Sequence, residues 1–169
     1  MLKKKRNPIR FFLVFFMFLF SLTVFDGSGI SLAIKGVAPF LAISLLVPFS
    51  EFYPLSHSAV VGLLCGAVAD SISVDSYCYN TIALFLLAVL ANLLAQWVFN
   101  RNLKASIALC FLLSCAYYLF YWLFFIAFSL GFSDNLRYLL QSALPSAVYT
   151  AVLSAPFYYI FRRVKNKFE

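Results

Sequence analysis

The chain has 169 residues, of which 64% are hydrophobic and only 11% are charged. A soluble domain carries roughly 25% charged residues, so this composition excludes an ordinary soluble protein and indicates a polytopic membrane protein. The net charge of +7 lies mainly before the first apolar run and after the last one, which argues against a nucleic-acid partner. Basic flanks of this kind orient membrane spans and favour an anionic inner leaflet, so we expect anionic lipids as a partner.

Six apolar runs follow one another along the chain, and each is close to the roughly 20 residues that a membrane-spanning helix needs. We expect spans at about 9–25, 30–49, 57–74, 81–99, 105–132 and 138–161. No clear small-residue cleavage site follows the first run, so we expect a retained helix there rather than a signal peptide. With short connections throughout, the sequence predicts an all-α, six-helix membrane protein with a single transmembrane domain over residues 1–169.

Prolines lie inside two of the expected spans. Pro39 falls in the second, and Pro145 and Pro156 fall in the sixth. A proline removes one backbone N–H and clashes with the preceding turn of a helix. We therefore expect helix kinks at these three positions.

The third run carries small residues at every fourth position and then an acid: Ser58, Gly62, Gly66 and Asp70. Positions four apart lie on one helix face, so the run presents a smooth stripe that ends in a carboxylate. Small residues let a second helix approach closely in lipid. The stripe is a candidate packing surface, either for another helix of this chain or for a helix of a partner protein.

Two ionisable residues fall inside the expected spans, Lys35 in the second and Asp70 in the third. Both lie about one helical turn from the same side of the membrane, and consecutive helices usually pack side by side. Because a charge in lipid is costly, one hypothesis is an intramembrane ion pair between them. The other is that Lys35 extends to the outer headgroups while Asp70 lies at a frayed helix end.

The distribution of Lys and Arg predicts the orientation. If the chain starts inside and crosses six times, all but two of its 13 basic residues fall in inside segments. The two exceptions are Lys35, within a span, and Arg137, in an outer loop. The positive-inside rule therefore predicts that both termini are cytoplasmic.

The sequence contains little that could carry catalysis. His57 is the single histidine, and no cysteine or acid stands at metal-ligand spacing around it. The four cysteines show no paired spacing, and the few acids are scattered over different connections. We expect no catalytic site, no cofactor and no bound metal.

At this point the chain resembles the MreD family, the small integral membrane proteins of the bacterial rod-shape system, or elongasome. The length and the number of apolar runs agree with that family. So do the small-residue stripe with its acid and the proline-containing last run with its basic tail, namely Gly62, Gly66, Asp70, Leu144, Pro145 and Pro156. The family also leads us to expect an amide-type residue near Thr150, where this chain has none.

The resemblance to MreD implies a non-enzymatic scaffold in the bacterial cytoplasmic (inner) membrane. Such a scaffold would bind MreC, a single-pass (bitopic) protein, and support the peptidoglycan synthase RodA with its transpeptidase partner. It also implies a fold similar to the S-components of energy-coupling-factor (ECF) transporters and assigns Gly62, Gly66 and Asp70 to packing or interface positions. The alternative is an S-component proper, which binds a vitamin or other micronutrient. S-components dock through an Ala-x3-Ala pattern on their first helix, and the first run here is Phe-rich without it.

Overall fold

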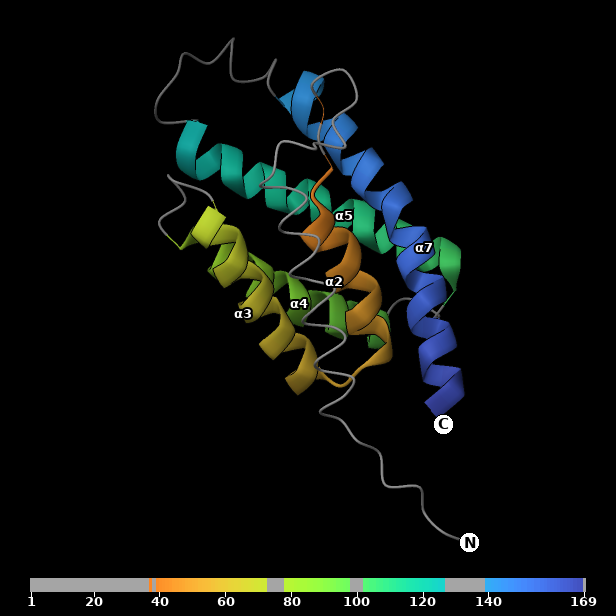
Figure 1. Ribbon diagram of the computed structural model, residues 1–169. Coiled ribbons are helices and arrows are strands. Elements are labelled where there is room, and N and C mark those ends of the chain that lie inside the picture. Colours follow the sequence, from red (N-terminus) through yellow and green to blue (C-terminus); the bar gives the residue numbers. More distant parts are fainter. Residues whose placement is uncertain (1–36, 38, 73–77, 98–101, 127–138, 169) are drawn as a thin grey trace, which may run out of the picture.

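A computed structural model describes residues 37, 39–72, 78–97, 102–126 and 139–168 (Figure 1). The expected first span and Lys35 lie outside these residues. The described chain is built from helices: α2 (Leu41–Phe52), α3 (Leu55–Ile72), α4 (Tyr79–Trp97), α5 (Leu103–Tyr121), the π-helical turns η1 (Trp122–Ile126) and η2 (Leu139–Ala143), and α7 (Leu144–Phe168). The predicted all-α class is confirmed.

Four of the described helices are long and apolar enough to cross a membrane, over Leu55–Ile72, Tyr79–Trp97, Leu103–Phe124 and Gln141–Lys165. They agree with four of the six expected spans and make the chain a multi-pass membrane protein. The total of six spans and the cytoplasmic location of both termini stay predictions.

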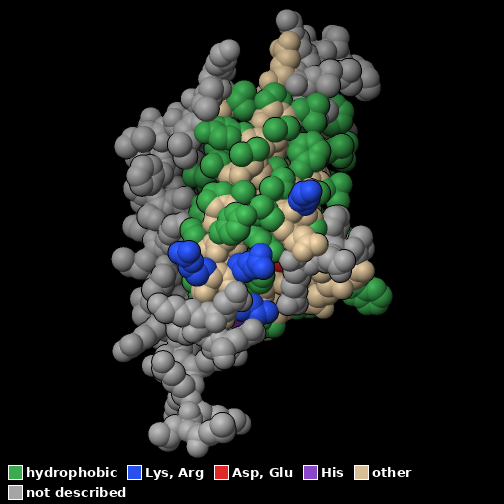
Figure 2. Space-filling model, turned by 90° about the vertical axis from the view of Figure 1, so that its right-hand side faces the viewer, with side chains coloured by type: hydrophobic (Ala, Val, Ile, Leu, Met, Phe, Trp, Pro, Cys, Tyr) green, Lys and Arg blue, Asp and Glu red, His purple; other side chains and the backbone are tan. Residues whose placement is uncertain are grey.

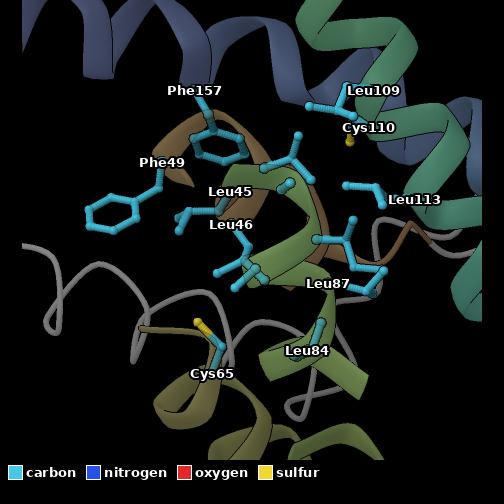
Figure 3. Close-up of a cluster of buried hydrophobic side chains, with 14 of the residues drawn as sticks. Leu45, Leu46, Phe49, Cys65, Leu84, Leu87, Leu109, Cys110, Leu113 and Phe157 are labelled. Carbon is cyan, nitrogen blue, oxygen red and sulfur yellow. The ribbon is translucent and has the colours of Figure 1, made fainter. Parts of the chain in front are cut away.

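Helix α2 occupies the centre of the described structure, between the α3–α4 pair and the α5–α7 pair (Figure 1). Nine consecutive residues, from Ile43 to Glu51, are buried. Figure 3 shows Leu45, Leu46 and Phe49 of α2 among side chains of the surrounding helices, including Leu84 and Leu109. A helix that is apolar on all sides is stable only inside such an enclosure.

The second expected span, 30–49, differs from the observed helix at both ends. Helix α2 begins at Leu41, after Pro39, and continues through Glu51 to Phe52, residues that the sequence analysis places beyond that span. Its 12 residues reach only about 18 Å at 1.5 Å per residue. That is well short of the roughly 30 Å of a hydrocarbon core, so α2 alone does not cross the membrane.

The fifth and sixth expected spans need similar corrections. Regular α-helix in the fifth ends at Tyr121 and gives way to the π-helical turn η1. The last helix continues to Phe168, so much of the expected basic tail is helical rather than a separate segment. Pro145 lies at the junction where the π-helical turn η2 continues into α7, and Pro156 lies inside α7. The kinks expected at these prolines stay predictions.

Candidate functional site

The carboxylate of Asp70, in the last turn of α3, caps the first turn of α4. Its Oδ1 accepts the backbone N–H of Asn80 at 3.1 Å, and its Oδ2 accepts the N–H of Thr81 at 2.8 Å. The hydroxyl of Thr81 donates to the same Oδ2. The first N–H groups of a helix have no partner within it and carry partial positive charge, so an anion stabilises them.

Cys78 explains why this cap comes from a different helix. An N-cap residue normally has an extended backbone, and its own side chain accepts the first N–H groups. The carbonyl of Cys78 accepts the N–H of Ile82 at 3.3 Å, which places Cys78 at the N-cap of α4. Its φ is +63°, and its thiol is a poor acceptor. Asp70 thus does what the N-cap side chain would otherwise do.

The glycines of the stripe bring α3 against the backbone of α4. A Cβ added to Gly66 would lie 2.3 Å from the Cα of Thr81. One added to Gly62 would lie 2.8 Å from both the Ala88 Cβ and the Leu84 carbonyl oxygen. Neither position has room for a side chain, because the obstacle is largely backbone. In the described residues, this face of α3 is therefore covered by a helix of the same chain.

Ser58, at the start of the stripe, is fully buried, and its hydroxyl donates to the Pro54 carbonyl at 3.3 Å. The four stripe residues thus differ in their contacts. Two glycines allow close approach, the serine bonds the residue just before its helix, and the acid bonds the next helix.

A hydrogen-bonded network continues from this cap to α5. The Tyr117 hydroxyl donates to the side-chain carbonyl of Asn80, and the Tyr79 hydroxyl donates to the Tyr117 backbone carbonyl at 3.1 Å. The Tyr117 ring stacks on Phe40, just before α2, with centroids 4.9 Å apart. We call this region, where α3 ends and α4 begins, the Asp70 end.

The N-terminus of α2 belongs to the Asp70 end too, and α7 supplies its cap. The Phe40 N–H donates to the Thr150 hydroxyl oxygen at 3.0 Å, and that hydroxyl donates to the Ser146 carbonyl at 2.7 Å. Thr150 is fully buried. No water reaches such a site in a membrane, so the bond must come from another helix.

At the opposite end, which we call the basic end, Asn92 of α4 caps the last turn of α2. Its side-chain N–H₂ donates to the backbone carbonyls of Ser50 at 2.6 Å and Tyr53 at 2.8 Å. The Ser50 carbonyl would normally accept the N–H four residues on, but that residue is Pro54, which has none. The Gln96 side chain donates to the Asn92 oxygen at 2.6 Å and so fixes the orientation of the amide.

Small polar residues also line the contact between α5 and α7. They recur at steps of four on both helices, as Ser106, Cys110 and Ser114 on α5 and as Ser146, Thr150 and Ser154 on α7, and all are buried. The Cys110 thiol approaches the Thr150 carbonyl at 3.9 Å. Small residues at this spacing let two helices pack closely in lipid.

The structure brings together only part of what the sequence predicts. Asp70 lies against α4, whereas its ion pair with Lys35 stays a prediction because Lys35 lies outside the described residues. His57 is exposed, with its ring nitrogen 3.3 Å from the Ser56 hydroxyl. Within the described ranges, no group of three His, Cys, Asp or Glu side chains could hold a metal ion.

Sequence reasoning missed Asn92, and it noted the position of Thr150 only as a departure from the family's pattern, without its role as a cap. Both are neutral, so a search for ionisable residues within apolar runs passes over them. The available signal was a hydrogen-bonding side chain in the middle of an apolar run. Such a side chain must find a partner in lipid. Chemically, these residues and Asp70 hold helices together through their ends.

A family model described as rod shape-determining protein MreD matches residues 5–168, nearly the whole chain. No curated protein and no solved structure matches it. Because the family match extends from one end of the chain to the other, through every capped helix end described above, the chain belongs to the MreD family of rod shape-determining proteins.

Proposed function

We propose that this protein is a non-enzymatic scaffold of the cell-wall elongation machinery in the bacterial inner membrane. In that role it binds an MreC-type bitopic membrane protein and supports RodA and its transpeptidase partner. The observation that carries the proposal is the family match over residues 5–168, because MreD proteins determine rod shape.

The structural role of the polar side chains supports the proposed scaffold function. Asp70, Asn92 and Thr150 each hold a helix end of this chain in place. Asn92 and Thr150 are buried, and buried polar groups rigidify and specify one arrangement when they are satisfied. A rigid surface loses less conformational freedom when a partner binds, which favours affinity.

The exposed face of α4 offers a contact area for a partner's single helix. Large apolar side chains recur along it at helical spacing, and they end in a Trp that is 84% exposed: Ile82, Leu86, Leu90, Leu93 and Trp97. The opposite face of α4 packs on α3 and α2. A bitopic partner could therefore lie along α4 without disturbing the internal packing.

Affinity purification tests this function. The tagged full-length protein would be isolated from its native cell in mild detergent, and the co-purified proteins would be identified by mass spectrometry. We expect recovery of an MreC-type protein and of cell-wall synthases, well above their recovery with an unrelated, identically tagged polytopic protein. Recovery of ATPases with a membrane coupling subunit instead would overturn the scaffold in favour of the transport alternative.

Two double variants test whether the partner's helix lies along α4. Leu86→Ala/Leu90→Ala trims the exposed face of α4, and Val148→Ala/Val152→Ala trims an equally exposed stripe of α7. If the partner lies along α4, the first pair lowers recovery of the MreC-type protein while the second leaves it unchanged. Equal recovery with both pairs would move the contact elsewhere. The likeness of fold to ECF S-components stays a prediction, and no observation favours the transport alternative.

A further inference from the structure

The last turns of α7, residues 162–168, form a basic segment with the sequence RRVKNKF. Figure 2 shows Lys and Arg side chains mostly in the lower part of the molecule, below a band of hydrophobic side chains. Among residues 162–165, the part of this segment whose side chains the structure describes, none is buried. Local stability follows the number of buried contacts, so the order of the segment depends on what holds α7 just before it.

Aromatic rings at the C-terminal end of α2 hold α7 at this point. The Phe161 ring meets Phe49 edge to face, with centroids 5.6 Å apart, and meets Tyr53 at 6.5 Å. The rings of Phe49 and Tyr53 stack on each other at 4.4 Å. One turn earlier on α7, the Tyr158 ring lies 5.2 Å from that of Phe52. Stacked and edge-to-face pairs are favourable beyond the area that they bury, so these rings fix α7 against α2.

Lys165 extends this contact into the basic segment. Its Nζ lies 6.0 Å from the centre of the Phe52 ring, and an aromatic face attracts a cation at such a distance. Phe52 is the last residue of α2. The same end of α2 therefore contacts both the buried aromatic residues of α7 and the basic segment that follows them.

The C-terminal end of α2 is in turn fixed by α4. The Asn92 amide donates to the carbonyls of Ser50 and Tyr53, and Gln96 holds that amide in its orientation. Tyr53 thus has two contacts of different kinds, since its carbonyl bonds α4 and its ring meets α7. Because lipid offers no replacement donor, these carbonyls stay paired only while Asn92 is in place.

We propose that the C-terminal end of α2 is a conformational link, through which the position of α4 determines the local stability of residues 162–168. The link runs from Asn92 through Tyr53 to Phe161. When α4 moves Asn92 away, the last turn of α2 loses its cap and loosens, and its rings no longer hold Phe161. A membrane-embedded helix thereby controls the order of a charged segment at the end of α7. The link goes beyond the proposed scaffold function and does not depend on it.

Amide hydrogen exchange of the purified full-length protein in mild detergent tests the link. Mass spectrometry follows deuterium uptake in peptides from the end of α2, from the middle of α3 and from the end of α7. Asn92→Leu removes both donated bonds and keeps the branched shape of the side chain. We expect exchange in residues 158–168 to become about tenfold faster, the effect of losing about one net hydrogen bond. Exchange in the middle of α3 should change by less than about twofold.

Two further variants separate the link from a general loss of stability. Tyr53→Leu keeps the backbone carbonyl for Asn92 but removes the ring that meets Phe161, so exchange in residues 158–168 should become about threefold faster. Thr150→Val removes the cap at the other end of α2 and should leave these amides within about twofold of the unmodified protein.

Unchanged exchange at the end of α7 in Asn92→Leu would overturn the link, because α7 would then be ordered independently of α4. An equal rise in Asn92→Leu and Thr150→Val would also overturn it, since both variants would merely loosen the whole bundle. If Asn92→Leu does not fold, Tyr53→Leu decides alone. Unchanged exchange in residues 158–168 of that variant excludes the link.

Discussion

The two ends of the bundle meet the same requirement with opposite chemistry. At the Asp70 end, an acceptor satisfies the N–H groups of a helix start, and for α4 this acceptor is the carboxylate of Asp70 in α3. At the basic end, an amide donor satisfies the carbonyls of a helix finish. In both cases the capping group comes from a neighbouring helix, because lipid offers no hydrogen bonds. The sign of each cap follows the helix dipole, positive at the start of a helix and negative at its finish.

The ends also differ in how closely the helices approach. Glycines let α3 lie against the α4 backbone at the Asp70 end, which leaves no room for a side chain. At the basic end, the buried side chain of Asn92 lies between α4 and the end of α2, and the exposed Gln96 bonds its amide oxygen. Variants that add bulk should therefore lower stability most at the Asp70 end. Variants that change the charge of a capping residue should have different effects at the Asp70 end and at the basic end.

Gly66→Ala is expected to have the largest effect. Its new Cβ would lie 2.3 Å from the Thr81 Cα, so α3 and α4 must move apart and the Asp70 cap must stretch. Overpacking costs about 1–3 kcal/mol or more. We expect the upper part of that range, which corresponds to a fall of about 6–12 °C in the melting temperature of the detergent-solubilised protein. Tryptophan fluorescence during heating measures it.

Two comparisons calibrate this result. Gly62→Ala, with obstacles at 2.8 Å, should cost less than Gly66→Ala. Ala67→Val adds bulk at an exposed neighbouring position and should stay within about 0.5 kcal/mol of the unmodified protein. Equal melting temperatures for Gly66→Ala and Ala67→Val would show that α3 does not lie on the α4 backbone as described.

Exchanging acid and amide at the two capping residues, Asn92→Asp and Asp70→Asn, should lower the stability by unequal amounts. Asn92→Asp puts an acceptor and a negative charge against two carbonyls, with no donor left for Ser50 or Tyr53. Leaving buried groups unpaired costs about 1–3 kcal/mol, more when a charge is involved. Asp70→Asn keeps an acceptor oxygen at the start of α4, so we expect a loss nearer 1 kcal/mol. Chemical denaturation in detergent would compare the two, and a larger loss for Asp70→Asn would contradict the dipole argument.

Local patterns are what the sequence reveals most directly. The membrane class follows from composition, and the stripe in α3 follows from residues four apart, which any helix places on one face. The target of Asp70 does not follow, because it depends on the backbone of a second helix and on the left-handed conformation of Cys78. The role of Asn92 depends on Pro54, 38 residues earlier in the chain, whose missing N–H leaves a carbonyl free.

The length of α2 could not be predicted from hydropathy either. An apolar average over 30–49 does not distinguish Phe40, whose backbone is extended, from the helix that follows it. The same average stops before Ser50 and Glu51, which are polar yet buried inside the helix. Hydropathy reports where a chain can enter lipid, whereas the ends of a short internal helix are set by tertiary contacts.

Thr150→Val removes the cap on the N-terminus of α2 while keeping the side-chain volume. The Phe40 N–H then loses its acceptor in a buried site, at a cost of about 1 kcal/mol. Thr150→Ser keeps the hydroxyl and is the matched control, with most of the stability retained. The same thermal melts measure both, and indistinguishable values for the two variants would mean that the Phe40 N–H bonds elsewhere.

The Asp70 end also contains a backbone conformation that the described part of the basic end lacks: Cys78 has a φ of +63°. A side chain in that region costs about 1–2 kcal/mol, whereas glycine adopts it freely. Glycine also gains entropy in the unfolded chain, so Cys78→Gly should stabilise the protein by only about 0.5 kcal/mol. Cys78→Ala removes the exposed thiol but keeps the strain and should leave the melting temperature unchanged. If both variants raise it equally, the gain comes from losing the thiol. If Cys78→Gly lowers the melting temperature, the backbone at Cys78 is not strained. The left-handed conformation would then not explain why Asp70, rather than the N-cap side chain, caps α4.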